Sequence, residues 1–304
     1  MAHTIQKGIN IWSFDQSLSL ETCMKMAKDA GFEGIELALA AKGPLSMEST
    51  DEDILAIRRM AEAIGIRINA LATGLYWQYS LTSNREDIRE KAKAVARREM
   101  EIGKLLGADV VMVCPGAVGV DFQPEDVVPD AHDIEFFAGS EIIDYDVAYE
   151  RSRDALRELG AYAAQVGIKI GVENIWNKFL LSPLEMRAFI DEINCPNVGV
   201  WLDVANMMMF GYPEQWIKIL GKRIIKVHFK DFRCAVKSLD GFVDLLAGDV
   251  NWKAVREGLE AIGYDGWCNG EMCPTYKQYT DQMIYNCSAA MDCILGRPLR
   301  RKTW

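Results

Sequence analysis

The amino-acid sequence predicts a single (β/α)₈ barrel that spans residues 1–304. Short apolar runs alternate eight times with longer amphipathic stretches, which is typical of parallel strands joined by crossover helices. Glycine stands at six points where a helix should stop and the next strand begin: Gly31, Gly65, Gly107, Gly167, Gly221 and Gly263. Eight such units favour a closed barrel over an open sheet.

The bounds of each expected element follow from the period of its apolar residues. In the stretch 85–106, for example, Ile88, Ala92, Val95 and Met100 recur every three to five residues while charged residues take the other faces, which indicates a helix. We expect strands at 8–14, 34–39, 67–72, 109–114, 169–173, 198–203, 224–229 and 266–271. We expect helices near 19–30, 51–64, 85–106, 147–166, 183–193, 214–220, 252–262 and 278–294.

Charge and composition exclude several classes of function. The chain has 34 Lys and Arg against 44 Asp and Glu, a net charge of −10, which argues against a broad grip on nucleic acid or an anionic membrane. No stretch approaches the roughly 20 apolar residues of a membrane span, and the first residues lack the apolar core of a signal peptide. The eight cysteines include no Cys-x-x-Cys pair, so we expect reduced, mostly buried thiols in a cytoplasmic protein.

Four polar residues at the ends of neighbouring strands form the candidate functional site. Glu173, Asp203, His228 and Glu271 stand at the ends of the fifth to eighth expected strands, where such barrels carry their chemistry. Three buried carboxylates repel one another unless they are neutralised, and a divalent cation resolves that conflict. Oxygen-rich ligation with one histidine suits Mn²⁺, Mg²⁺, Co²⁺ or Zn²⁺. The alternative is that each residue is an ordinary polar strand terminus.

The segments around these strand ends resemble the xylose-isomerase-like barrels. The resemblance rests on 173–178 (Glu-Asn-Ile-Trp-Asn-Lys), 202–206 (Leu-Asp-Val-Ala-Asn), 227–232 (Val-His-Phe-Lys-Asp-Phe) and 247–252 (Ala-Gly-Asp-Val-Asn-Trp). The last segment is similar to the turn that precedes the seventh barrel helix in that superfamily. Sugar-phosphate isomerases, ketose 3-epimerases, inosose dehydratases and endonuclease IV all belong to it, and the resemblance covers nearly the whole chain.

The resemblance implies that Glu173, Asp203, His228 and Glu271 hold one divalent metal ion, with Mn²⁺ favoured. It also implies that Glu173 and Glu271 act as acid and base on opposite faces of the substrate. A metal chelated by a ketose carbonyl and the neighbouring hydroxyl acidifies the C–H group between them and stabilises the enediolate. One carboxylate then removes the proton and the other returns it with inverted configuration. Two opposed glutamates therefore favour 3-epimerisation of a ketose or ketose phosphate over aldose–ketose isomerisation.

Two departures from the family pattern bear on the substrate. Ketose 3-epimerases that act on free sugars usually carry His three residues after the strand-six Asp, where this chain has Asn206. They also favour Arg six residues after the strand-seven His, where this chain has Cys234, with Arg233 one residue earlier. The chain is therefore more similar to the sugar-phosphate branch, including pentulose-5-phosphate 3-epimerases. Asn206 is expected either to bond a substrate hydroxyl or to cap a helix that starts near 207.

The other candidates for substrate binding lie near the same end of the barrel: Trp12, Glu36, Trp176, Lys178, Lys230 and Arg233. The three basic residues are expected either to meet a phosphate or sugar hydroxyl or to be solvated loop charges. The tryptophans are expected either to wall the pocket or to pack in the barrel. The run 207–210 (Met-Met-Met-Phe) is expected in the core.

Two of the predicted loops at this end are long. Residues 73–84 are aromatic and polar, which is typical of a wall over a small polar ligand. Residues 115–146 contain nine Asp or Glu and no Lys or Arg. This acidic loop is expected to be a lid, with a solvated insertion or a subunit contact as the alternatives.

Three alternative functions share the barrel. An inosose dehydratase would use the same ligands and the same first proton abstraction, so it stays open. A non-catalytic sugar-binding barrel has no need of two opposed bases. An endonuclease IV-like role needs more histidines than the three in this chain and a basic DNA-binding face. We therefore expect an isomerase with a small sugar or sugar phosphate as its partner, in a homodimer or homotetramer.

Overall fold

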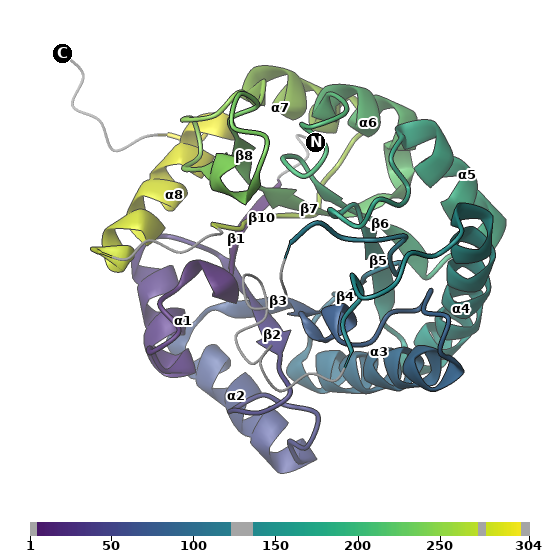
Figure 1. Ribbon diagram of the computed structural model, residues 1–304. Helices are drawn as coiled ribbons and strands as arrows, with labels where there is room; N and C mark the ends of the chain where they lie inside the picture. Colours follow the sequence, from purple (N-terminus) through teal and green to yellow (C-terminus); the bar gives the residue numbers. More distant parts are fainter. Residues whose placement is uncertain (1–4, 123–135, 273–277, 299–304) are drawn as a thin grey trace.

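The computed structural model describes residues 5–122, 136–272 and 278–298, and these form the predicted barrel (Figure 1). Eight parallel strands close in the order β1-β10-β7-β6-β5-β4-β3-β2, with the α-helices around the outside. The barrel strands are β1 (Gln6–Asn10), β2 (Gly34–Leu39), β3 (Arg67–Thr73), β4 (Val110–Val113), β5 (Lys169–Glu173), β6 (Val198–Asp203), β7 (Ile224–Phe229) and β10 (Trp267–Gly270). The prediction of a (β/α)₈ barrel is confirmed.

Each barrel strand is followed by a helix that packs on the outer face of the sheet (Figure 1). The helices are α1 (Leu20–Asp29), α2 (Asp51–Ile64), α3 (Glu86–Leu106), α4 (Tyr145–Val166), α5 (Pro183–Ile193), α6 (Pro213–Leu220), α7 (Trp252–Ala261) and α8 (Thr280–Ile294). Short 3₁₀ turns lie at η1 (Ile11–Ser13), η2 (Leu75–Trp77), η5 (Gly221–Arg223) and η6 (Leu239–Gly241). A two-stranded antiparallel ribbon, β8 (Asp231–Phe232) with β9 (Phe242–Val243), follows β7.

The helix stops are where the glycine pattern predicts them. All six predicted glycines have a positive φ, which side chains with a Cβ adopt only under strain. At Gly107, for example, φ is 81° and the backbone N–H closes the end of α3 on the carbonyls of Gly103 and Lys104. Leucine, isoleucine and valine side chains between strands and helices then form one continuous buried core.

The first strand is shorter than expected. It was predicted over 8–14, but it ends at Asn10 and the chain turns into η1. The side chain of Asn10 accepts a hydrogen bond of 2.6 Å from the backbone N–H of Trp12, and this cap diverts the chain from the sheet. Trp12 therefore lies in a turn at the mouth of the barrel.

Two further expectations from the sequence concern membrane spans and the state of the cysteines. Among the described residues, no helix is both long enough and apolar enough to cross a membrane. The seven described cysteines are all free thiols, and Cys23, Cys114, Cys268 and Cys287 are buried.

Candidate metal centre

The four predicted ligands meet at the carboxyl end of the barrel. Glu173 and Asp203 are the last residues of β5 and β6, His228 is the last but one of β7, and Glu271 directly follows β10. The strand register pairs Asp203 with His228 across β6 and β7, and His228 with Asn269 across β7 and β10. Because parallel strands end at one rim, the sheet itself brings these side chains together.

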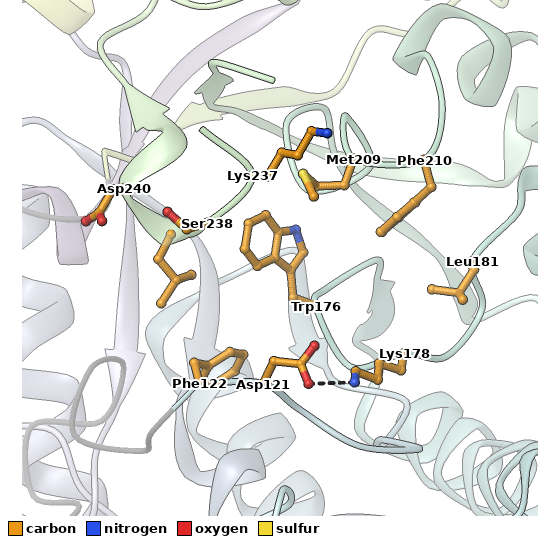
Figure 2. A pocket seen from close by; sticks show the side chains of 11 residues that line it. Asp121, Phe122, Trp176, Lys178, Leu181, Met209, Phe210, Lys237, Ser238 and Asp240 are labelled. Carbon is orange, nitrogen blue, oxygen red and sulfur yellow. Dashed lines mark ion pairs between the residues drawn. The ribbon is translucent and has the colours of Figure 1, made fainter. Parts of the chain in front are cut away.

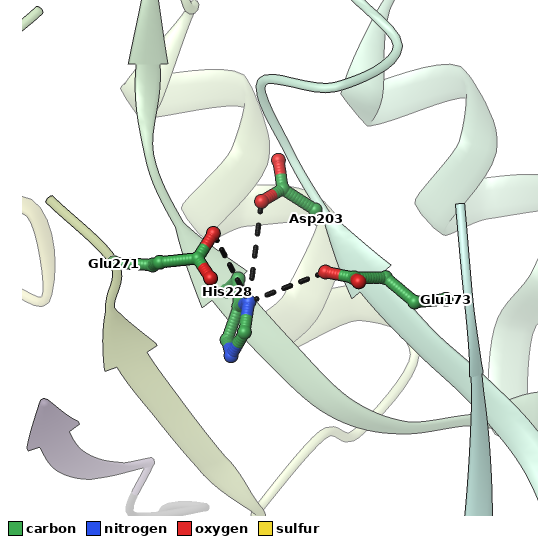
Figure 3. A group of neighbouring side chains, drawn as sticks. All are labelled: Glu173, Asp203, His228 and Glu271. Carbon is green, nitrogen blue, oxygen red and sulfur yellow. Dashed lines mark ion pairs between the residues drawn. The ribbon is translucent and has the colours of Figure 1, made fainter. Parts of the chain in front are cut away.

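The cluster is compact (Figure 3) and almost fully buried. One ligand atom from each of Glu173, Asp203, His228 and Glu271 lies within 4.8 Å of all the others. The carboxylates surround Nδ1 of His228, at 3.4 Å for Glu173 Oε1, 3.6 Å for Glu271 Oε2 and 4.0 Å for Asp203 Oδ2. All four residues are at most 5% exposed.

Two atoms that face the centre of the cluster have no hydrogen-bond partner among the described residues: His228 Nδ1 and Asp203 Oδ2. The other carboxylate oxygen of Asp203, Oδ1, is hydrogen-bonded, since it accepts the backbone N–H groups of Ala205 and Asn206 at 2.8 Å each. Buried polar atoms without partners are rare and usually mark a bound group. Three carboxylates, one imidazole and these two unsatisfied atoms fit a divalent cation.

Burial and charge separate the two glutamates. Burial raises the pKa of Glu173 to about 7, although His228 opposes this rise. Burial would also raise the pKa of Glu271, but the Lys230 ammonium and His228 hold it well below its usual range. Burial disfavours the charged form of His228, yet the carboxylates of Glu36 and Glu271 raise its pKa well above the usual value. The pKa values of the two glutamates therefore differ, as those of a general acid and a general base do.

Lys230 lies inside the cluster and is 7% exposed. Its ammonium nitrogen is 3.2 Å from Asp203 Oδ2 and forms a second ion pair with Glu271 Oε2. It also lies 3.5 Å from Asn206 Oδ1 and 4.7 Å from the centre of the Phe242 ring. Of the predicted basic residues, Lys230 is thus the one that the structure places against the ligands.

Glu36 occupies a different position from the one expected of a substrate-binding residue. Its carboxylate is fully buried in β2 and contacts Nε2 of His228, at 2.9 Å from Oε1 and 3.1 Å from Oε2. It therefore lies behind the histidine ring, on the side away from the other three carboxylates. We correct its role from substrate binding to the support of His228, because it has no exposed surface for a substrate to touch.

Asn206 does not cap a helix, since no helix begins near 207 and α6 starts only at Pro213. Its amide instead donates a hydrogen bond of 2.9 Å to the carbonyl of Asn174. The carbonyl of Asn206 accepts a bond of 2.9 Å from Trp176 Nε1. These contacts join the loops after β5 and β6 directly beside the ligands. Asn206 and Trp176 are therefore close to the cluster, and their contact with substrate stays a prediction.

The remaining substrate-binding candidates lie farther out. Lys178 is exposed and pairs with Asp121 at 2.6 Å. Arg233 is exposed and donates a bond of 2.7 Å to the carbonyl of Ala247, next to the β8–β9 ribbon. Trp12 is half-buried in η1. Their contact with substrate stays a prediction.

The run 207–210 is only partly in the core. Met207 is fully buried, but Met209 and Phe210 are 37% and 51% exposed, so the core prediction is wrong for the end of the run. These two side chains line a pocket of about 820 Å³ among the loops that follow β4 to β7 (Figure 2). The pocket is lined by Asp121, Phe122, Trp176, Lys178, Leu181, Met209, Phe210, Lys237, Ser238, Leu239 and Asp240.

The two long loops contact each other. Thr82 Oγ1 donates to the carbonyl of Ala117 and accepts the N–H of the same residue at 2.9 Å. The N–H of Ala138 donates to the carbonyl of Trp77 at 2.8 Å. Residues 123–135 of the acidic loop lie outside the described residues, so its role as a lid stays a prediction.

Sequence reasoning missed two anchors of the site. Asn174 bonds both the N–H and the carbonyl of Asp203 at 2.9 Å, which fixes the ends of β5 and β6 to each other. Asp231 accepts Nε1 of Trp252 at 2.8 Å together with three backbone N–H groups. Both residues lie in the segments that carry the family resemblance. That resemblance was the signal from which their roles could have been found.

The structure is thus a (β/α)₈ barrel with a buried cluster of three carboxylates and one histidine at its carboxyl end, and this cluster fits a divalent cation. The model of the xylose isomerase-like TIM barrel family matches residues 24–285, a range that contains all four cluster residues. The chain therefore belongs to this family.

Two relatives match the chain in sequence. An inosose dehydratase of Geobacillus thermodenitrificans is 24% identical over 267 residues, which is 82% of this chain and 80% of that protein. An uncharacterised protein of Methanocaldococcus jannaschii is 31% identical over 117 residues, which is 36% of this chain and only 39% of that protein.

Solved structures of two sugar epimerases share the fold. A D-psicose 3-epimerase crystallised with D-fructose superposes with a TM-score of 0.75 at 18% identity, over 96% of this chain and 100% of that one. An L-ribulose 3-epimerase gives a TM-score of 0.76 at 17% identity, over 96% and 95% of the two chains.

Proposed function

We propose that the protein is a divalent-metal-dependent isomerase that inverts C3 of a ketose or ketose phosphate. The observation that carries the proposal is the placement of Glu173 and Glu271, which approach His228 from opposite sides (Figure 3). Epimerisation needs one group to take a proton from a carbon and another to return one on the opposite face. The two glutamates supply that pair.

The difference in pKa between the glutamates assigns their roles in one direction of the reaction. Lys230 and His228 hold the pKa of Glu271 well below its usual range, so Glu271 is the ionised residue that accepts the proton from C3. Glu173, whose charged form burial disfavours, takes up a proton from solvent in the substrate complex and delivers it to the other face of the same carbon. In the reverse direction the two residues exchange roles.

The metal ion belongs in the cluster of Glu173, Asp203, His228 and Glu271. A divalent cation bound there would supply Lewis-acid polarisation of the substrate carbonyl. Mn²⁺ is favoured, with Mg²⁺, Co²⁺ and Zn²⁺ as alternatives, because the ligand set is three oxygens and one nitrogen.

Three further side chains bind the substrate in this proposal. The Lys230 ammonium and the Asn206 amide face the cluster and bond the hydroxyl groups of the sugar. Trp176, on the pocket wall, packs against the more distant part of the substrate. A phosphate on that part would lie toward Lys178, at the edge of the same pocket.

A keto-inositol dehydratase is the second candidate. The match to the inosose dehydratase over 82% of this chain favours it. Both reactions begin with removal of a proton next to a carbonyl, so Glu271 keeps its role. The second glutamate would then protonate a departing hydroxyl instead of the carbon.

Deuterium exchange followed by NMR separates these reactions. The Mn²⁺-loaded protein is incubated in D₂O with ketoses, pentulose and hexulose phosphates, and keto-inositols, and the metal is removed before the spectra are recorded. Deuterium at C3 with an epimeric product supports the proposal, whereas a dehydrated product supports the second candidate. An aldose product would replace epimerisation by aldose–ketose isomerisation.

Substitution of the glutamates tests the mechanism on the substrate so found. Glu173→Gln and Glu271→Gln should each abolish C–H exchange. Glu99→Gln is the matched control, since Glu99 is equally buried but bonds the Tyr76 hydroxyl at 2.8 Å. Undiminished exchange in either of the first two variants would contradict the proposal.

Several expectations about the surroundings of the protein stay predictions. These are a sugar or sugar phosphate as the small-molecule partner, no binding to nucleic acid or membrane, a homodimer or homotetramer, and a cytoplasmic location.

A further inference from the structure

A layer of buried polar side chains lies inside the barrel behind His228. Glu36 of β2, Asn69 of β3, Lys226 of β7 and Asn269 of β10 are each 0% exposed. The interior of such barrels is usually filled by branched apolar residues. A buried carboxylate and a buried ammonium are costly unless each is fully partnered, so this layer needs an explanation.

The barrel is shaped to hold the two amides. A Cβ at Gly8 would lie 2.2 Å from Asn269 Oδ1 and 2.6 Å from Asn69 Nδ2. A Cβ at Gly34 would lie 2.8 Å from the same Asn69 nitrogen. Only glycine leaves room at these positions of β1 and β2. The amides therefore occupy space that the neighbouring strands leave for them.

Lys226 sets the orientation of the two amides in this layer, and besides the hydrogen bonds that lead from it to Glu36, the nitrogen of Asn269 donates back to Asn69 Oδ1 at 3.1 Å. The Lys226 ammonium donates to Asn69 Oδ1 at 3.0 Å, and because an ammonium only donates, it holds the oxygen of that amide toward itself. The nitrogen of Asn69 then donates to Asn269 Oδ1 at 3.0 Å. The nitrogen of Asn269 in turn donates to Glu36 Oε2 at 3.0 Å.

Both oxygens of Glu36 accept donors from the chain. Oε2 accepts from Asn269 and lies 3.5 Å from the Lys226 ammonium, while Oε1 accepts the amide of Asn10. Each oxygen of Glu36 thus accepts an amide N–H, and the Lys226 ammonium lies beside Oε2, which is the environment of an ionised carboxylate. An ionised carboxylate only accepts hydrogen bonds. The hydrogen between Glu36 and His228 therefore belongs to Nε2 of the histidine.

We infer that Lys226, Asn69, Asn269 and Glu36 form a positioning network that keeps a hydrogen on Nε2 of His228 and directs Nδ1 at the metal cluster. The inference deepens the proposed function and rests on the metal site in it. Ligand histidines commonly donate their second ring N–H to such a partner, which fixes both the tautomer and the ring orientation. Trp201 supports the same orientation, with its ring perpendicular to the imidazole and their centres 5.0 Å apart.

Metal affinity is the first test. Isothermal titration with Mn²⁺ should show binding about 10–100-fold weaker in Glu36→Gln than in the unaltered protein. Glu99→Gln, which changes an equally buried glutamate outside the network, should bind Mn²⁺ as the unaltered protein does. Equal affinity in all three proteins would overturn the inference.

The Nε2–H proton is the second test, and it does not depend on activity. The chain has only three histidines, so ¹⁵N-histidine labelling gives few signals, and replacing His3 and His132 in turn by Gln assigns that of His228. With diamagnetic Mg²⁺ present, this proton should be strongly deshielded and slow to exchange in the unaltered protein and in Glu99→Gln. Glu36→Gln should shift it upfield and speed its exchange.

Glu36→Asp keeps the charge but shortens the side chain. Its Nε2–H signal and its Mn²⁺ affinity should therefore lie between those of the unaltered protein and those of Glu36→Gln. This variant also replaces Glu36→Gln if the latter does not fold. An Nε2–H signal that is the same in every folded Glu36 variant would overturn the inference. If no substrate reacts but Glu36→Gln still weakens Mn²⁺ binding and shifts the Nε2–H signal, the proposed function fails while the network stands.

Discussion

The ammonium nitrogen of Lys230 lies 3.2 Å from Oδ2 of Asp203 and forms an ion pair with this atom of the metal cluster. A cation of the chain itself thus lies beside the position in which we expect the metal. Lys230 and a bound divalent ion carry charge of the same sign, so they compete for the same carboxylates. The lysine should therefore serve the substrate rather than the metal.

Replacing Lys230 by Met tests that division of roles. Loss of a like charge a few ångströms away should strengthen Mn²⁺ binding by at least about fivefold. Turnover should nevertheless fall by about 100-fold or more, because the developing charge on the substrate loses a cationic partner. Isothermal titration and steady-state kinetics measure the two effects. Lys253→Met, at an 85% exposed position on α7, should change neither. A parallel loss of metal binding and turnover would mean instead that Lys230 builds the metal site.

The proton on Glu173 predicts how metal binding depends on pH. Burial raises the pKa of this residue to about 7, and His228 also holds a proton because its pKa is well above the usual value. Both must lose their protons to act as ligands. Metal binding should thus release about one proton at pH 8, from His228, and about two at pH 6.

The direction of the pH dependence follows from this proton release. Metal affinity falls as pH falls because metal binding expels protons. Below about pH 7 the fall should steepen by roughly a further factor of ten per pH unit. Calorimetry in buffers of different ionisation enthalpy counts the protons. In Glu173→Gln the number released should stay the same between pH 6 and pH 8. An extra proton that persists in that variant would assign it to another residue.

The fold and the clustering of the four residues could be predicted because both depend on one regularity. In a parallel barrel the end of a strand in the sequence is also the rim of the barrel in space. Glu173 and Asp203 could therefore be placed together, although Asp203 lies 29 positions beyond Asn174, the residue that follows Glu173. The glycines that end the helices could also be predicted, because the end of a helix depends on residues that are close together in the chain.

The network behind His228 could not be predicted, because it depends on which strand positions lie at the same height in the closed barrel. The register between β2 and β3 shifts at Ile35 and Glu36, so that Glu36 pairs with Ala70 instead of Asn69. No alternation of apolar and polar residues reveals such a shift. Asn206 was ambiguous because asparagine suits both a helix cap and a substrate contact, and in the structure it is Asp203 that caps the local turn by accepting the N–H groups of Ala205 and Asn206.

Asp231 should be essential to the stability of the loop that follows β7. Its two oxygens accept the N–H groups of Phe232, Leu246 and Val250 and Nε1 of Trp252, at 2.8–3.2 Å. Asp231→Asn keeps the shape but turns an NH₂ group toward two of these donors. Bonds to a charged acceptor contribute about 1.5–3 kcal/mol each, so the free energy of unfolding should fall by about 3 kcal/mol. Urea denaturation measures the change.

Asp240 in the same loop provides the control for Asp231, because its side chain is exposed. Asp240→Asn should leave the unfolding free energy within about 0.5 kcal/mol of its original value. A loss of the same size in both variants would attribute the effect to loop charge and not to the buried hydrogen bonds.

Gly8 links the packing of β1 to the metal centre, although it is not a ligand and does not contact one. Gly8→Ala would place a methyl group 2.2 Å from Asn269 Oδ1 and 2.6 Å from Asn69 Nδ2, so both amides must move. Their movement breaks the hydrogen bonds that lead to Glu36 and frees the ring of His228. We expect the affinity for Mn²⁺ to fall by about tenfold, as for other losses of support to a ligand. Gly119→Ala is the matched control, since its added methyl would meet only the Lys178 side chain at 3.9 Å. If Gly8→Ala lowered stability yet bound Mn²⁺ as tightly as Gly119→Ala, the amides would be packing elements and the orientation of His228 would not depend on them.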